Sequence, residues 1–118
     1  MELKKDNRGD LFEWIKSEEF GQIFVSTTKP GVTRGNHYHH TKTEKFLVIR
    51  GEAEIGFRQI DSDQVITYKV NGLEPTVVDI PTGYTHNITN TGQTELITLF
   101  WANEIFDTER PDTYFLEV

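Results

Sequence analysis

Three of the four histidines in this chain lie in one short segment, where His37 and His39 alternate with other residues and Glu44 follows. Imidazole and carboxylate groups are ligands for Zn²⁺, Fe²⁺, Mn²⁺ or Ni²⁺. The chain contains no cysteine, so a disulfide framework and a thiolate metal site are both excluded. The remaining histidine, His86, follows a second glycine turn and can supply a fourth ligand.

A strand would place His37 and His39 on one face, because alternate side chains of a strand point the same way. Tyr38 and His40 would then point to the opposite face. Residues 40–43 can turn the chain, so that Glu44 returns on a neighbouring strand. An isolated His-x-His pair in a β protein is more often a pair of surface or hydrogen-bonded residues. The spacing of these two histidines alone therefore leaves a metal site and a structural role both open.

The segments that must position these residues have the sequence pattern of short strands separated by residues typical of turns. One segment, Leu11–Phe20, is the exception and is expected to start as a short helix. The tail that follows residue 108 is expected to be extended and held by Tyr114 and Phe115. This pattern predicts an all-β sandwich or barrel. Strands are expected at residues 22–28, 44–60 with a turn at Gly51, 64–70, 75–81, 85–92 and 94–102.

The chain has the size of one domain, with 118 residues. Its acidic balance, 19 Asp and Glu against 12 Lys and Arg, argues against nucleic-acid binding. No apolar run approaches the length of a membrane span, and no signal-peptide pattern opens the chain. A cytoplasmic location is therefore expected.

Two separated blocks resemble the two sequence motifs of the cupin superfamily. The first is G-x5-H-x-H-x4-E-x6-G, and the second is P-x-G-x2-H-x3-N. The glycine that usually opens the second motif is replaced by Pro75, and Gly72 lies three residues earlier, so a longer turn is expected there. The resemblance implies a small jelly-roll barrel with three histidines and one glutamate facing a single metal. The matching residues are Gly31, His37, His39, Glu44, Gly51, Pro81, Gly83, His86 and Asn90.

Other residues resemble a narrower group of cupins, which act on nucleotide-linked keto-sugars. These are the opening Asp6-x-Arg8-Gly9-Asp10-Leu11-Phe12, the block from Arg34 to Tyr38, and the tail FDTERPDTYF. Over nearly its whole length the chain is similar to the C-terminal cupin domain of CapF-type enzymes, the bifunctional enzymes of bacterial capsular polysaccharide synthesis. The N-terminal half of such enzymes is an NADPH-dependent short-chain dehydrogenase/reductase, and no dinucleotide-binding fingerprint occurs here. Residues 1–118 are therefore expected to be one cupin domain excised from a longer chain.

The resemblance implies epimerisation at C3 of a UDP-linked 2-acetamido-2,6-dideoxy-4-ketohexose, a precursor of N-acetyl-L-fucosamine. A metal held by His37, His39, Glu44 and His86 would act as a Lewis acid on the keto-sugar, and zinc suits a reaction without redox change. In the full-length enzyme the C4 ketone would then be reduced with NADPH.

The base and acid of this reaction have several candidates in or beside the two motifs. They are Glu44, His40, Tyr84 and Lys45, with Lys42 and Tyr38 as further possibilities. Strand alternation points His40 away from the metal, and Tyr84 can equally be a packing residue.

Substrate binding is predicted for Arg34, because a planar guanidinium suits the oxygens of a diphosphate. Tyr38 and Arg58 are further candidates for substrate contact. Each of the three has an ordinary alternative, as a turn, packing or solvent-exposed strand residue.

Three alternative functions remain open from the sequence. A metal-free epimerase or ketoisomerase would use His37 as base with His39 as its partner. A sugar-binding cupin without turnover would use the metal structurally. An iron dioxygenase would share the same four ligands. The family also implies a homodimer, for which the apolar pattern of Leu11–Phe24 permits an interface.

Overall fold

The computed structural model describes residues 3–118, and within them the chain is all-β. The predicted strands from residue 22 to residue 102 are all present, with shorter bounds at several ends. A short N-terminal strand, which the sequence analysis did not predict, precedes them. The strands are β1 (Leu3–Asp6), β2 (Gly9–Ser17), β3 (Gly21–Thr28), β4 (Thr33–Tyr38), β5 (Glu44–Arg50), β6 (Glu52–Gln59), β7 (Val65–Asn71), β8 (Val77–Ile80), β9 (Tyr84–Asn90), β10 (Leu96–Ala102) and β11 (Tyr114–Phe115).

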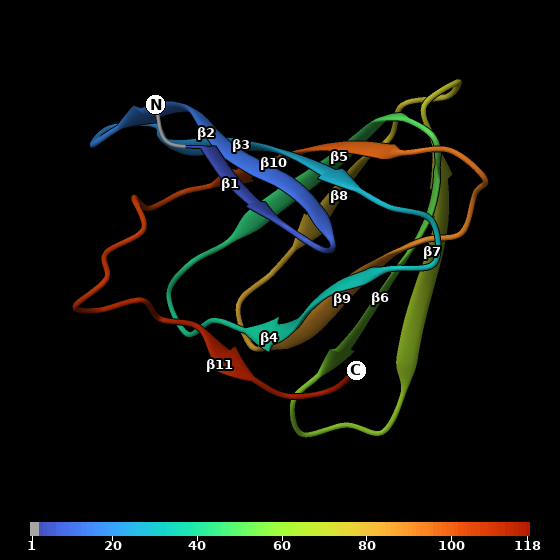
Figure 1. Ribbon diagram of the computed structural model, residues 1–118. Helices are drawn as coiled ribbons and strands as arrows, with labels where there is room; N and C mark the ends of the chain where they lie inside the picture. Colours follow the sequence, from blue (N-terminus) through green and yellow to red (C-terminus); the bar gives the residue numbers. More distant parts are fainter. Residues whose placement is uncertain (1–2) are drawn as a thin grey trace.

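Two antiparallel sheets face each other, as Figure 1 shows. One sheet has the strand order β1-β2-β3-β10-β5-β8, and the other has the order β11-β4-β9-β6-β7. The chain crosses between the sheets several times, so strands that are distant in sequence become neighbours. This arrangement is the predicted jelly-roll barrel.

The predicted helix at Leu11–Phe20 is wrong, because most of this segment forms β2. Strand β2 pairs with β1 on one side and with β3 on the other. Pairing with β3 from Leu11 to Ser17, and with β1 up to Phe12, satisfies many main-chain groups of β2, whereas a short isolated helix would be marginal in water. Tertiary pairing therefore overrides the local preference for a helix.

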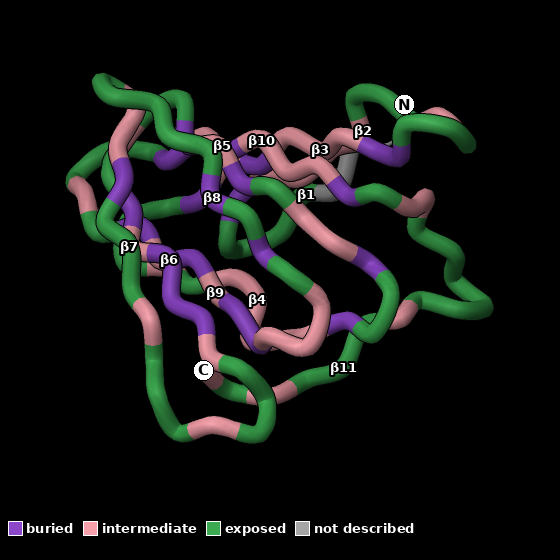
Figure 2. The backbone as a smooth tube through the Cα atoms, turned by 180° about the vertical axis from the view of Figure 1, so that it is seen from behind, coloured by how far each residue is buried: buried purple, intermediate pink, exposed green. Residues whose placement is uncertain are grey.

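The hydrophobic core lies between the two sheets, where Figure 2 shows buried stretches on β5, β6 and β9. Successive residues alternate in exposure along β5 and β8, as expected for strands with one buried face. The core therefore holds β5 and β9, which carry two of the candidate ligands, in a fixed relation. Its buried members are Phe46, Val48, Ala53, Ile55, Phe57, Val70, Val78, Ile80, Ile88 and Leu96.

An apolar row crosses the outer face of the six-stranded sheet. Its members are paired in register from β2 to β8, and each is half-buried or exposed. The row consists of Phe12, Val25, Leu99, Leu47 and Val77.

Within residues 3–118, no helix is long and apolar enough to cross a membrane.

Candidate metal centre

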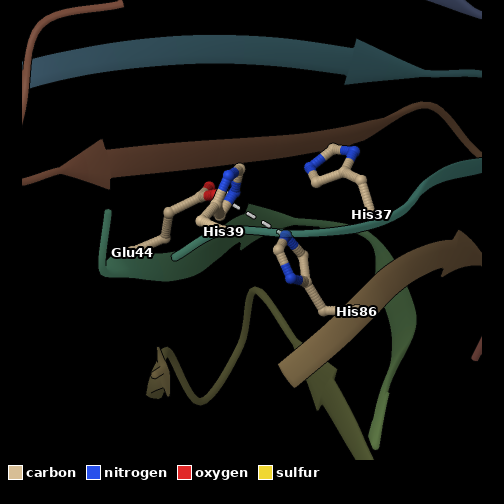
Figure 3. Close-up of side chains that lie close together, drawn as sticks. All are labelled: His37, His39, Glu44 and His86. Carbon is tan, nitrogen blue, oxygen red and sulfur yellow. Dashed lines mark hydrogen bonds and ion pairs between the residues drawn. The ribbon is translucent and has the colours of Figure 1, made fainter. Parts of the chain in front are cut away.

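Four potential ligands lie close together, as Figure 3 shows. His37 lies in β4, His39 lies just after it, Glu44 begins β5, and His86 lies in β9. One ligand atom from each residue lies within 4.8 Å of the others. The two cupin motifs, which are far apart in sequence, thus converge on one point.

A bulge in β4 directs His37 toward this point. The register of β4 against β9 shifts between Gly35 and His37, and His37 is then paired with His86. Gly35 has a φ of 103°, and a Cβ there would lie 2.7 Å from the carbonyl oxygen of His86. Glycine is therefore required for this close approach. Asn36 also has a positive φ, of 60°, a conformation that asparagine tolerates better than most residues.

Hydrogen bonds orient two of the imidazoles. The Nδ1 atom of His39 lies 2.6 Å from the carbonyl oxygen of Asp112, and that of His86 lies 3.2 Å from the carbonyl oxygen of Tyr84. Because a carbonyl only accepts, each Nδ1 carries the proton, and each Nε2 faces the cluster. Metal-ligating histidines are oriented in this way.

The Nε2 atom of His86 provides the test of whether a metal fits. It is buried and has no hydrogen-bond partner among residues 3–118, although Glu44 Oε1 lies 3.5 Å away. The same Glu44 oxygen is hydrogen-bonded to Nε2 of His39. An unpartnered buried nitrogen is costly, and a cation between His86 and Glu44 would satisfy it. Three imidazoles and one carboxylate form a donor set that zinc and other divalent transition metals accept.

The protonation states of Glu44 and His37 suit metal binding, whereas His39 would lose its Nε2 proton to Glu44 or solvent when a metal binds. Burial opposes the charge of Glu44, but its hydrogen bond with His39 and the close approach of His86 outweigh burial and hold the pKa of this carboxyl group well below its usual range. Burial, followed by the charge of His86, lowers the pKa of His37 to about 4. Burial also acts to lower the pKa of His39, but its hydrogen bond to Glu44 outweighs burial and raises it. At neutral pH, Glu44 is therefore ionised and His37 is neutral, as ligands must be.

A pocket of about 340 Å³ opens onto the cluster. His37, Glu44 and His86 form its polar wall, while aromatic and aliphatic side chains from both sheets form much of the rest. Such a combination of an apolar lining and a few convergent polar groups is typical of small-molecule sites. The other lining residues are Arg8, Leu11, Phe24, Arg34, Gly35, Phe46, Ile88, Phe100, Phe106 and Thr113.

Two guanidinium groups line the same pocket. Arg34 is half-buried and donates to Thr28 Oγ1 at 3.0 Å and to the Thr27 carbonyl oxygen at 2.9 Å. Arg8 is paired with Asp6 at 2.7 Å. The sequence analysis predicted Arg34 as a substrate residue but gave Arg8 no role. The feature of the sequence that could have indicated a role for Arg8 was its place in the Asp-x-Arg-Gly block, which resembles cupins that act on nucleotide-linked keto-sugars.

Of the four predicted catalytic residues, Glu44 is the one that lines this pocket within the described chain. His40 is exposed, and its ring centroid lies 4.8 Å from that of Tyr114 on the other side of the segment. Lys45 is exposed and pairs with Asp79 at 2.5 Å. Tyr84 packs against the core and lines a second hollow, which Glu44 and Lys45 also line.

The two other predicted substrate residues also lie away from the pocket lining. Tyr38 stacks on Tyr114, with 5.3 Å between ring centroids. Arg58 donates to the carbonyl oxygens of Ser62 and Glu117 at 3.0 and 2.7 Å. Arg58 thus holds the C-terminal segment, and Tyr38 packs against it.

Comparisons with known proteins agree with this geometry. Residues 4–114 match the family model of the polysaccharide biosynthesis C-terminal domain. The chain is 46% identical over 116 residues to a UDP-2-acetamido-2,6-beta-L-arabino-hexul-4-ose reductase from Pseudomonas aeruginosa, and the match covers 98% of this chain and 31% of that protein.

Solved structures show the same fold. The capsular polysaccharide assembling protein CapF from Staphylococcus aureus is 53% identical, with a TM-score of 0.97, over 98% of this chain and 34% of that chain. An oxalate decarboxylase from Lactobacillus farciminis, 22% identical, shares the fold with a TM-score of 0.74 over 87% of this chain and 31% of its own. The chain thus spans about a third of the length of the Pseudomonas aeruginosa and Staphylococcus aureus relatives. It belongs to the polysaccharide biosynthesis C-terminal domain family and has the cupin fold.

Proposed function

We propose that this chain is a metal-dependent sugar-nucleotide epimerase domain. Its substrate would be a UDP-linked 2-acetamido-2,6-dideoxy-4-ketohexose, and the reaction would invert C3 on the route to an N-acetyl-L-fucosamine precursor. The observation that carries the proposal is the unpartnered, buried Nε2 atom of His86 beside Glu44 in the wall of the pocket. The name of the Pseudomonas aeruginosa relative, a UDP-hexulose reductase, supplies the substrate class.

The four side chains His37, His39, Glu44 and His86 would hold the metal. When bound, a divalent cation such as zinc would supply Lewis-acid polarisation of the sugar carbonyl. Arg34, with Arg8 beside it, would bind the diphosphate at the side of the pocket. The apolar lining would exclude water around the reacting carbon.

Proton transfer would fall to a side chain that lines the pocket, because a base must reach the C3 proton. Glu44 and His37 meet this requirement. Glu44 is ionised but its lowered pKa makes it a weak base. His37 is neutral at pH 7 and can accept a proton, but its lowered pKa of about 4 makes it a weak base as well. His40, Lys45 and Tyr84 are less favoured because they lie outside this pocket.

A metal-free epimerase that uses His37 as base is the second candidate. It is favoured by one observation: the side chain of His37 is neutral and makes no hydrogen bond to any residue of the described chain. In that case His39 and Glu44 would form an ion pair without a metal.

A homodimer is part of the same proposal. The apolar row on the outer face of the six-stranded sheet would be covered by a second copy of the chain in a homodimer, because such a continuous apolar face is typical of an interaction surface. In a full-length enzyme an NADPH-dependent reductase domain would precede this one, and the reaction would take place in the cytoplasm.

Metal content and isotope exchange test the proposal together. Purified chain should contain about one zinc ion per chain, and His37→Ala should lose it. With the UDP-keto-sugar in deuterium oxide, the C3–H bond should break and a C3–D bond should form from solvent. Exchange without any metal in the wild type would replace the first candidate by the second. Neither metal nor exchange would refute both.

A further inference from the structure

The C-terminal segment lies along the strand that carries the histidines. It leaves the six-stranded sheet after β10 and crosses to the other sheet, where β11 pairs with β4 (Figure 1). Tyr114 is the register partner of Tyr38, and Phe115 is that of His37. Further along, the main-chain N–H of Leu116 donates to the carbonyl oxygen of Asn36 at 2.9 Å. The segment thus adds an outer strand directly against the histidine strand.

Asp112 contacts the other end of the same histidine segment through two different groups. Its main-chain carbonyl accepts from Nδ1 of His39 at 2.6 Å. Its carboxylate accepts from the consecutive main-chain N–H groups of His40, Thr41 and Lys42 at 2.9, 2.8 and 3.1 Å. The hydroxyl group of Thr41 also donates to it, at 3.0 Å. One residue therefore holds both the His39 ring and the turn that leads from His39 to Glu44.

The backbone of Asp112 adopts an uncommon conformation to make these contacts. Its φ is 47°, in the left-handed region that a residue with a side chain seldom adopts. Such conformations persist where the surrounding contacts require them, and they are concentrated at functional sites. Here, Asp112 directs both its carbonyl and its carboxylate to the histidine segment.

We propose that Asp112 is a positioning residue of the metal centre. Its carbonyl keeps the proton of His39 on Nδ1, so that Nε2 faces the other ligands. Its carboxylate fixes the turn, and hence the distance between His39 and Glu44. This inference rests on the proposed metal function of the four ligands.

A purely structural role would give a different result. If Asp112 only fastened the tail, its loss would lower the stability of the metal-free and the metal-bound chain equally. A positioning role requires that metal affinity falls as well, because indirect partners of ligating histidines typically contribute a factor of about 10–100 in affinity.

Asp112→Asn is the variant for this test, because asparagine tolerates the same φ and keeps one of the two acceptor oxygens. Asp107→Asn is the matched control. Asp107 lies in the same segment and bonds locally to Glu109 and Arg110, not to the histidine turn. Zinc affinity is measured by competition with a chromophoric chelator, and unfolding is measured on the metal-free proteins.

We expect Asp112→Asn to bind zinc about 10–100-fold more weakly than the wild type, and Asp107→Asn to match the wild type. The visible spectrum of the Co²⁺-loaded protein should also change in Asp112→Asn alone. Equal zinc affinities for the wild type and both variants would refute the positioning role while leaving the metal centre intact. A wild type that takes up no zinc would refute the metal centre and this role together.

Nitrogen NMR of the zinc-loaded wild type provides a check that does not depend on the folding of a variant. The proton of His39 should be on Nδ1 and the metal on Nε2. The opposite assignment would overturn the role of the Asp112 carbonyl.

Discussion

Two pairs of neighbouring residues, His37 with His39 and Tyr38 with His40, have opposite surroundings. The first pair meets Glu44 and His86 in the ligand cluster. The second pair stacks with Tyr114 against the C-terminal segment.

The contrast shows that the face of the strand, rather than the residue type, decides the role. Of the adjacent histidines, His39 is 4% exposed, with its Nε2 atom bonded to a carboxylate, whereas His40 is exposed to solvent. The inner pair can bind a metal because it converges with ligands from two other strands. The outer pair fastens the segment that contains Asp112.

The largest expected effect comes from comparing an alanine substitution on the inner face of the strand with one on the outer face. His39→Ala should lower zinc affinity by more than the roughly 100-fold that loss of an indirect partner costs, because a ligand is removed. His40→Ala should leave zinc content unchanged, because its side chain lies outside the cluster. Elemental analysis after gel filtration measures both variants. Loss of zinc in both would show that the two faces are not independent.

Zinc bound at the ligand cluster on the inner face should stabilise the folded chain. With free zinc at about 100 times its dissociation constant, the free energy of unfolding should rise by about 2.7 kcal/mol. Urea denaturation with zinc and with a chelator measures the difference. The increase should disappear in His86→Ala. The same increase in that variant would place the bound zinc elsewhere.

Truncation on the outer face should reduce stability without affecting the metal. Tyr38→Ala removes the aromatic contact with Tyr114 and should lower the free energy of unfolding of the metal-free chain by about 1–2 kcal/mol. Its zinc affinity and substrate KM should be those of the wild type. An increased KM with unchanged stability would restore Tyr38 as a substrate residue and contradict its assignment to the outer face.

The smallest expected effect is a pH dependence at Asp112. Burial opposes the charge of this carboxylate, but hydrogen bonds from the main chain of Thr41, His40 and Lys42 outweigh it and hold the pKa well below its ordinary value of 3.8. Because the folded-state pKa is lowered, the stabilisation is complete above the unfolded-state pKa and is lost as pH falls below it.

Thermal unfolding of the metal-free wild type and Asp112→Asn should therefore differ by a constant amount from neutral pH down to about pH 5. The difference should shrink as the pH falls below about 4. A difference that grows on acidification would contradict the sign of the pKa shift.

Much of the barrel and its ligand cluster could be predicted from the sequence. The two motif blocks predicted the fold, and the His-x-His spacing predicted which side chains share a face. The helix prediction at Leu11–Phe20 failed, because pairing of β2 with β3 along its length, and with β1 at its start, outweighed local preference. The substrate roles of Tyr38 and Arg58 stay predictions, and the structure places both side chains against the C-terminal segment.

The sequence by itself determined the kinds of ligand and their alternation, because these depend on side-chain chemistry and on the two-residue period of a strand. The tertiary structure decided which tautomer His39 adopts, that Arg8 joins Arg34, and that Asp112 holds the turn before Glu44. The contacts of Asp112 with His39 and Lys42 join residues 73 and 70 positions apart. No local pattern specifies such a pairing, because it exists only once the C-terminal segment has crossed from one sheet to the other.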